Sequence, residues 1–237
     1  MKVQSDVYVI ILLTAVLSAG IIAVSRKFEK ADPLAKPKGI LVPVLLGVEM
    51  VHNAVKANVG ERTADSLTPY ILVLWVYIFC ANTISLFGLS SPTANLSVTL
   101  LLAIITWVLI QITELKYQGL GGYLHSFFEP LAVMFPMNVV GKFSTMVSMS
   151  IRLFGNILCG GIMMQLIYSA AQILSNTIAG WFGGHGNVFN FMAPIIAPIL
   201  HAYFDLFAGF IQTLVFVTLT MVLIGNDMPE DVRKGIA

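Results

Sequence analysis

The chain has 237 residues, of which 57% are hydrophobic and 11% are charged. Soluble domains carry about 25% charged residues, so this composition indicates an integral membrane protein with several helical spans. The net charge of +1 implies no nucleic-acid partner, and the two cysteines lie in apolar stretches without metal-ligand spacing. We therefore expect an all-α integral membrane protein with no cofactor and no metal site.

Apolar runs of spanning length follow one another along the chain. They lie at about 7–25, 68–89, 95–114, 138–176 and 188–225. We predict about five membrane-crossing helices in a single membrane domain, 1–237. Its parts are a first span with an amphipathic segment (1–66), two spans with a loop (67–137), a tilted hairpin (138–226) and a C-terminal tail (227–237). The first run has a weakly basic start, so we interpret it as a retained helix rather than a cleaved signal peptide.

A shorter run, 39–59, differs from the others because it carries polar residues three or four positions apart: Glu49, His52, Asn53 and Lys56. This spacing places the four side chains on one helical face. An amphipathic helix that lies in the membrane interface is the expected structure. A solvated face accounts for these side chains, and we assign them no chemistry.

The distribution of Lys and Arg between the spans predicts the orientation. Basic residues are dense in 26–66, absent from the loop 87–95, present again at Lys116 and Lys142, and absent from 176–187. They return in the C-terminal tail. The alternation favours an N-terminus outside the cell and a C-terminus in the cytoplasm.

The last two apolar runs are too long for upright spans. As continuous helices, 138–175 and 188–224 would each measure ~55 Å, against a hydrocarbon core of ~30 Å. Tilting or breakage must resolve the mismatch. Breakage is possible in the second run at Pro194 and Pro198, whereas the first run has no proline after Pro136. We predict a long, strongly tilted helical hairpin, with a glycine-rich loop at 180–186.

Arg152 is the one formal charge between Phe143 and Tyr168. A guanidinium stays protonated at any ordinary pH, so it cannot escape burial by becoming neutral. An intramembrane charge is by default a candidate functional group, although a structural ion pair or a snorkelling side chain is the alternative. On a helix, Ser148 and Asn156 lie within about 40° of Arg152, in a stripe of small and polar residues to which another backbone could pack closely.

Asp205 is the one formal charge of the last run. His201, Gly209 and Gln212 lie within about 40° of it on a helix, so carboxylate, imidazole and amide share a face. This pattern is typical of a polar path for an ion or proton, because a carboxylate at low dielectric has a raised proton affinity. Each residue has a structural alternative. Asp205 could be a counter-ion to Arg152, His201 a satisfied helix histidine, and Gln212 an interhelical hydrogen-bonding residue.

These residues carry a resemblance to a known family. The segment 148–156, SMSIRLFGN, resembles the pattern S-x-x-x-R-L-F-G-N of subunit a of F-type ATP synthases, bacterial type. The segment 204–212, FDLFAGFIQ, resembles the last helix of that family, where an ionisable residue precedes a glutamine by seven positions. Weaker similarity covers GLGGYLHSFFEP at 119–130 and the stretch around Asn82. The resemblance begins at about residue 65, and the N-terminal third is similar in layout.

The resemblance implies a non-catalytic stator subunit in the bacterial inner (plasma) membrane. Its partners would be a ring of c subunits and the b-subunit stalk, and its transported ion H⁺ or Na⁺. Arg152 would attract the ring carboxylates and separate two aqueous half-channels. Asp205 and Gln212 would take the positions of the family's ionisable residue and glutamine, with Asn156, His201 and Ser148 as further ion-translocation candidates.

One position departs from the family pattern. Many members carry Glu or His nine residues after the arginine, and here the residue is Gly161. The ionisable role would then fall on Asp205, alone or with His201.

Other functions are open at this point. A stand-alone secondary transporter with an Arg152/Asp205 gate would be expected to show internal repeats, and the sequence shows none. An intramembrane enzyme with His201 and Asp205 as acid and base lacks a convergent nucleophile. Three further polar residues, Asn82, Glu114 and Glu129, could line a channel, but we interpret them as helix-end residues.

Overall fold

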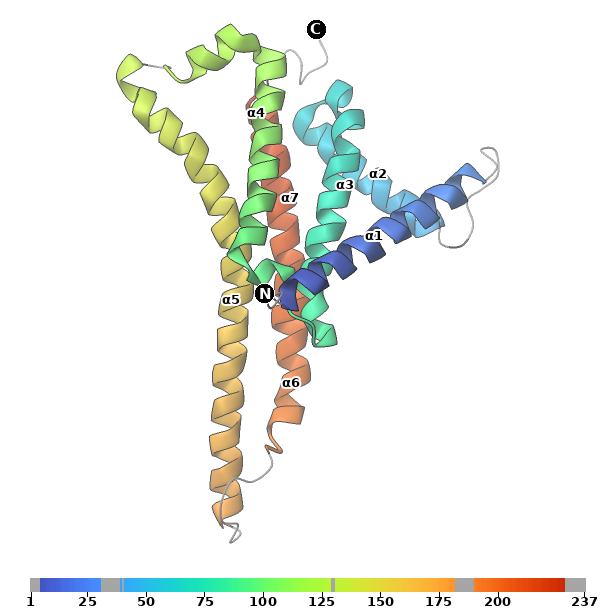
Figure 1. Cartoon of the computed structure of the whole chain (residues 1–237), viewed down its shortest axis with the longest axis vertical. Helices are drawn as coiled ribbons and strands as arrows, with labels where there is room; N and C mark the ends of the chain where they lie inside the picture. The colour runs from blue at the N-terminus through green and yellow to red at the C-terminus, as the bar shows by residue number, and fades with distance from the viewer. Residues whose placement is uncertain (1–4, 31–38, 40, 129–130, 182–189, 229–237) are drawn as a thin grey trace.

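The computed structural model describes residues 5–30, 39, 41–128, 131–181 and 190–228, and all regular secondary structure in this part of the chain is helical. The α-helices, shown in Figure 1, are α1 (Ser5–Glu29), α2 (Leu41–Val59), α3 (Glu61–Thr83), α4 (Leu96–Ser126), α5 (Phe135–Trp181), α6 (Ala193–His201) and α7 (Ala208–Asn226). Five segments are long and apolar enough to cross a membrane: Val7–Glu29, Thr63–Phe87, Leu96–Ser126, Ala132–Trp181 and Ala193–Asn226. The expected all-α fold with five candidate spans is confirmed.

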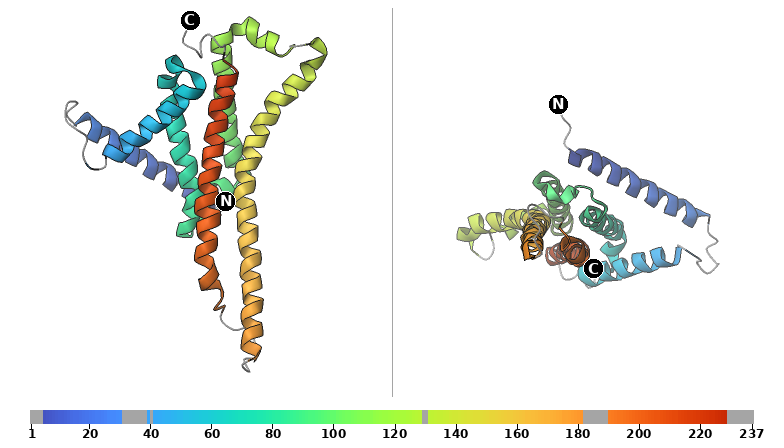
Figure 2. Two further views of the ribbon diagram at one scale, coloured as in Figure 1. Left: turned by 180° about the vertical axis from the view of Figure 1, so that it is seen from behind. Right: turned by 90° about the horizontal axis from the view of Figure 1, so that it is seen from below.

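Most of the helices run along the long axis of the molecule. Helices α3, α4, α5 and α7 pack against one another, and α5 with α6–α7 forms the expected long hairpin. Seen from below in Figure 2, these helices appear nearly end-on, whereas α1 and α2 lie across the view. Near the end that carries the C-terminus, the N-terminal part of α5 diverges from the other helices. The angle of the hairpin to a bilayer stays a prediction.

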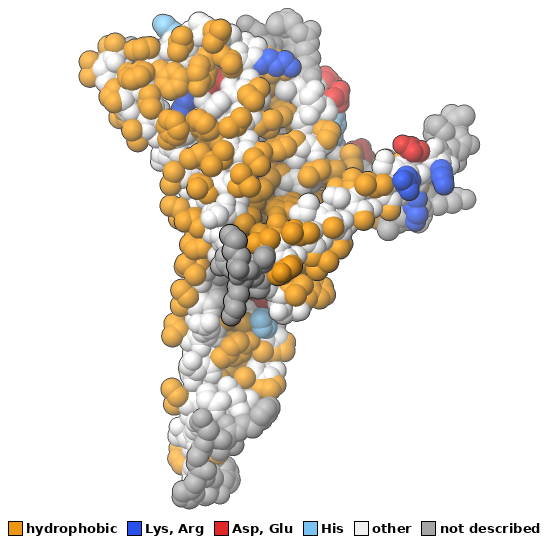
Figure 3. Space-filling view, in the orientation of Figure 1, with side chains coloured by type: hydrophobic (Ala, Val, Ile, Leu, Met, Phe, Trp, Pro, Cys, Tyr) orange, Lys and Arg blue, Asp and Glu red, His pale blue; other side chains and the backbone are white. Residues whose placement is uncertain are grey.

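The core lies where α2, α3, α4, α5 and α7 meet. Its fully buried side chains include Val55, Ile71, Ile78, Leu153 and Phe216. Many other large apolar side chains are exposed, and Figure 3 shows them covering much of the visible face along the whole length of the molecule. An apolar exterior of this extent is unfavourable in water and favourable in a bilayer.

Helix α2 matches the predicted amphipathic segment. Val55 and Val59 are buried against the core, while Glu49 and Lys56 are exposed. His52 is half-buried, and its Nδ1 lies 3.1 Å from the hydroxyl oxygen of Thr68 on α3. The polar face of α2 is therefore partly used to join it to α3, and its place in a membrane interface stays a prediction.

The second long run is broken at a position other than the predicted one. Pro194 lies in the first turn of α6, where its missing N–H is not needed, and Pro198 lies within α6 without ending it. The break is the π-helical segment η4 (Ala202–Phe207), which joins α6 to α7. Wide π segments inside helices often occur at functional sites, and this one contains Asp205. Helix α5 has no such break over its 47 residues.

Three short 3-10 segments complete the fold: η1 (Ile84–Phe87), η2 (Pro92–Ala94) and η3 (Ala132–Met134). Inside α4, Gly119 has a φ of 69°, a conformation that favours glycine, and here the helix turns away from its crossing part. The turn brings Ser126 back toward Glu114, as described below. Residues 182–186 of the glycine-rich loop and Glu129 lie outside the described residues.

Candidate functional site

Arg152 lies on the open side of α5 and is exposed. Within the described part of the chain, its guanidinium forms no hydrogen bond and no ion pair. It lines a groove between α5 and α7 with a volume of about 320 Å³. The other lining residues are Ser144, Thr145, Ser148, Met149, Leu219 and Leu223. Because a charge held at membrane depth is normally paired, this arrangement leaves room for a counter-charge that the described residues do not supply.

The face around Arg152 is largely open, and the close packing of another backbone against it stays a prediction. Ser148 and Cys159 are exposed beside it. Asn156 is half-buried, and its side-chain Nδ2 is buried without a hydrogen-bond partner. At the edge of the stripe, Gly160 faces Phe204 of η4. If residue 160 carried a Cβ atom, that atom would lie 3.7 Å from Cδ1 of Phe204. The small residues therefore serve two purposes, close packing of the hairpin at one edge and an open strip along Arg152.

Asp205 is paired with His201 and not with Arg152. Oδ2 of Asp205 lies 2.5 Å from Nδ1 of His201, one helical turn away. The aspartate side chain is 17% exposed and the histidine side chain 41% exposed. The suggestion that Asp205 is a structural counter-ion to Arg152 is therefore wrong.

Tyr168 extends this pair to a second helix. Its hydroxyl on α5 lies 3.0 Å from Nε2 of His201. A neutral imidazole protonated at Nδ1 would donate to Asp205 and accept from Tyr168, so both ring nitrogens are satisfied. The sequence contains no signal for Tyr168, because no local spacing links a residue of one helix to a partner 33 residues later.

Gln212 and Gly209 turn toward the core rather than toward the open face. The side chain of Gln212 is buried, and its Nε2 has no hydrogen-bond partner. Gly209 packs against Asn82, whose Nδ2 donates to the Gly209 carbonyl at 3.3 Å and to the Thr213 hydroxyl at 3.4 Å. Thr93 in turn donates to Oδ1 of Asn82 at 2.9 Å. Asn82 lies in the last turn of α3, as expected, and anchors α7 there.

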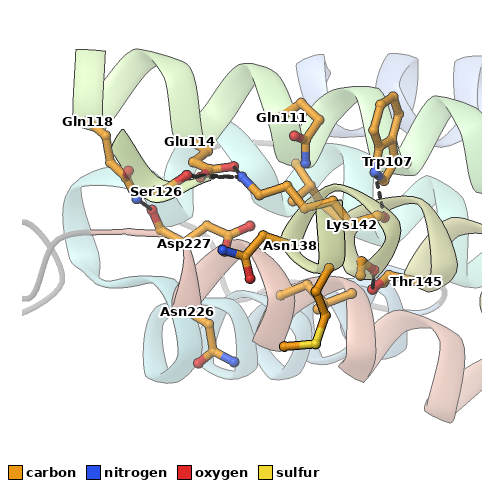
Figure 4. Close-up of a pocket in the computed structure, with 14 residues that line it drawn as sticks. Trp107, Gln111, Glu114, Gln118, Ser126, Asn138, Lys142, Thr145, Asn226 and Asp227 are labelled. Carbon is orange, nitrogen blue, oxygen red and sulfur yellow. Dashed lines mark hydrogen bonds and ion pairs between the residues drawn. The ribbon is translucent and has the colours of Figure 1, made fainter. Parts of the chain in front are cut away.

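A second polar cluster lies near the C-terminal end of α7 (Figure 4). Nζ of Lys142 is 2.7 Å from each carboxylate oxygen of Glu114. Glu114 is 2% exposed and lies within α4, so its interpretation as a helix-end residue is wrong. Lys142 counted only as a loop charge in the sequence analysis, but it lies inside α5.

This cluster surrounds a cavity of about 490 Å³ between α4, α5 and α7. Asp227 borders it at the end of α7, beside Asn138 in Figure 4. The main-chain carbonyl of Asp227 accepts a hydrogen bond from Nε2 of Gln118 at 2.7 Å. Burial and the nearby charge of Glu114 raise the pKa of Asp227 to about 6, and Lys142 opposes that shift.

The sequence matches the family described as "ATP synthase A chain" over residues 7–225. It is 34% identical over 177 residues to the "ATP synthase subunit a, sodium ion specific" of Propionigenium modestum, covering 68% of this chain and 54% of that protein. It is 30% identical to the "ATP synthase subunit a" of Mycoplasmoides gallisepticum, covering 91% of this chain and 74% of the relative. Similarity to the Streptococcus agalactiae "ATP synthase subunit a" extends over 93% of this chain and 91% of the relative, at 27% identity.

A helical bundle with five candidate spans, whose longest helix carries an arginine without a counter-charge among the described residues, has the features of a multi-pass membrane protein. The chain belongs to the ATP synthase subunit a family, the non-catalytic, ion-translocating membrane subunits of that enzyme.

Proposed function

We propose that this chain is the stator that carries H⁺ or Na⁺ to and from a ring of c subunits through two offset half-channels, which Arg152 keeps apart. The observation that supports this role is the exposed guanidinium with no counter-charge in the described residues. An ionised carboxylate on the ring would supply that counter-charge. Arginine suits the position better than lysine, because it stays charged when it is desolvated.

The pair of Asp205 and His201 is proposed to load the ring. The family's ionisable position, nine residues after the arginine, is Gly161 in this chain, which brings no side chain. The chain of Tyr168, His201 and Asp205 provides titratable groups on the same hairpin instead. In this role Asp205 takes the ion from the outer side and passes it to a ring carboxylate that has moved away from Arg152. The buried amides of Asn156 and Gln212 are proposed to border the path.

Release is proposed to occur on the other side of Arg152. A ring carboxylate that approaches the guanidinium after nearly a full turn is stabilised in its ionised form, so it gives up its ion. The groove lined by Ser148 and Thr145 leads from that point toward the C-terminal end of α7. The membrane potential drives the cycle with ~2.3 kcal/mol per charge per 100 mV. The b-subunit stalk would hold the chain against the torque, with the N-terminus outside and the C-terminus in the cytoplasm.

A stand-alone transporter gated by Arg152 and Asp205 receives less support. Such a gate needs the two charges to meet, and Asp205 is instead bonded to His201. An enzyme that uses His201 and Asp205 would need a reacting group beside them, and their further hydrogen-bond partner is the phenol of Tyr168 on α5.

The decisive experiment replaces Arg152 in the assembled complex. Arg152→Ala should abolish ion-driven ATP synthesis while leaving the subunit content of the complex unchanged. Arg26→Ala, at an exposed position near the end of α1, is the matched control and should leave synthesis intact. Normal synthesis in Arg152→Ala membranes would refute the proposed role.

A cross-linking experiment tests the partner directly. Cys159 is exposed in the described chain and lies two turns from Arg152 on the same strip, so it should cross-link to a cysteine introduced on the ring helix. Cys159→Ser should remove the product. If no register of ring cysteines gives a product, the ring does not face this strip.

A further inference from the structure

The cavity at the C-terminal end of α7 contains three charged groups, of which two neutralise each other. Nζ of Lys142 donates hydrogen bonds to both carboxylate oxygens of Glu114. Its ammonium group also lies 4.6 Å from the ring centre of Tyr123 and 4.5 Å from that of Phe127, which further fixes its position. Among the described residues that line this cavity, the Asp227 carboxylate is therefore the charged group without a directly bonded counter-charge.

Asp227 is fixed by its backbone and not by its carboxylate. Gln118 holds its main-chain carbonyl, whereas the side chain has no hydrogen bond or ion pair to any described residue. Figure 4 shows the side chain at the cavity, alongside Asn138 and on the side toward Lys142. A cavity of about 490 Å³ with this polar lining is large enough to hold water.

The cavity lies next to the groove at Arg152. Both are lined by Thr145 on α5 and Leu223 on α7, so they share a wall. Along α5 the residues Lys142, Thr145, Ser148 and Arg152 follow at intervals of three or four positions, which is one turn per step. The distance from Lys142 to Arg152 along the helix is ~15 Å. A polar strip thus runs from the guanidinium of Arg152 toward the carboxylate of Asp227, two groups that have no ion-pair partner in the described part of the chain.

We propose that Asp227 is a proton acceptor of the release path, and that the ion pair of Glu114 and Lys142 sets the electrostatic environment of its carboxylate. This inference rests on the proposed function. The proton leaves the ring carboxylic acid near Arg152, binds an oxygen of the Asp227 carboxylate, and then passes to the solution at the C-terminal side. The ring carboxylate and the guanidinium remain as a pair until the ring moves on.

The titration of Asp227 suits this role. Its neighbours are Glu114 and Tyr123 on α4 and Lys142 on α5, while α2 meets this end of α7 through the main chain of Asn58. Burial and the charge of Glu114 raise the pKa of Asp227 to about 6. A group whose pKa lies near the working pH can both bind and release protons readily. Glu114→Gln should lower that pKa, and Lys142→Gln should raise it.

The test measures passive and ATP-driven proton flow in membrane vesicles that contain the complete complex. The pH on the C-terminal side is varied from about 5 to 8, a range that includes the pKa of Asp227. In the unmodified complex, flow should increase as the pH rises through about 6, because the acceptor must be ionised. Asp227→Asn should reduce flow above that pH by about tenfold and abolish the transition. Asp227→Glu should restore most of the flow, and Asp65→Asn, at an exposed carboxylate on α3, should change nothing.

Several results would overturn the inference. Unmodified flow and pH profile in Asp227→Asn would do so, as would equal losses in Asp227→Asn and Asp227→Glu, which would indicate a structural role. A complex that carries Na⁺ without protons would also contradict it. If Asp227→Asn does not assemble, Asp227→Ser takes its place, and an unmodified flow and pH profile in that variant rejects the proposal. If Arg152→Ala abolishes transport but Asp227→Asn leaves it unchanged, this inference alone is rejected. If transport continues in Arg152→Ala, the proposed function is rejected.

Discussion

The two polar clusters on either side of Arg152 solve the problem of charge inside a membrane protein differently. Toward the hairpin loop, His201 and Asp205 pair within one helix and remain partly exposed. Toward the C-terminal end, Glu114 pairs with Lys142 from another helix, and the carboxylate is 2% exposed. The first cluster is a local pair that a mobile ion can reach, and the second is a buried pair that also holds helices together. The comparison teaches that partial exposure makes a charged pair a candidate for transport, whereas burial of a pair between two helices favours a structural role.

Within the two clusters, the largest effect is expected at Asp205. Asp205→Asn keeps a hydrogen-bonding group next to His201 but removes the group that binds a proton, so transport should fall by about 10²-fold or more. ATP synthesis and passive ion flow in vesicles measure the loss, with assembly followed by subunit content. Poor assembly with normal flow per assembled complex would instead mean that Asp205 is structural, and the contrast between the clusters would disappear.

The next effect is on stability and concerns Glu114 and Lys142. Glu114→Gln alone leaves a buried ammonium without its partner and should destabilise the chain by about 3–5 kcal/mol. The double variant Glu114→Leu with Lys142→Met removes both charges and should recover most of that loss. Thermal unfolding of the detergent-solubilised complex compares the variants. A double variant as unstable as the single one would show that the pair acts through something other than its buried charge.

A smaller effect is expected at Tyr168. Tyr168→Phe removes one hydrogen bond to His201, worth about 1 kcal/mol, so transport should fall less than tenfold and its pH profile should shift. Tyr8→Phe, at an exposed position on α1, is the matched control. An unchanged profile would remove Tyr168 from the proposed relay and leave His201 and Asp205 as a pair.

The smallest effect is expected at the exposed ion pair of Lys56 and Glu61. The hydrogen bond from Lys56 lowers the pKa of Glu61, so the pair stabilises the folded chain at neutral pH. That contribution is lost as the pH falls below the ordinary pKa of glutamate and through the lowered one. Glu61→Gln should slightly lower the unfolding temperature at pH 7 and leave it unchanged at low pH. A loss as large as that of Glu114→Gln would contradict the importance of burial.

The sequence predicted the spans because each is a long apolar run, and a bilayer requires such runs whatever the tertiary packing. It also identified Arg152 as exceptional, and it placed His201 and Asp205 on one face because the two residues are one turn apart. The π-helical break at Ala202–Phe207 was missed, because prolines give a local signal for a break and a π segment has none as clear.

Tertiary structure alone decided which charges meet. The partners Glu114 and Lys142 are 28 residues apart, and Tyr168 lies 33 residues before His201. Helical periodicity relates only residues within a few turns of one helix, so it carries no information on contacts between helices. The sequence therefore determined which segments enter the membrane and which side chains share a face. The packing of α4, α5 and α7 determined that Arg152 has no partner among the described residues while Glu114 and Lys142 pair with each other, because only packing sets the distance between charges on different helices.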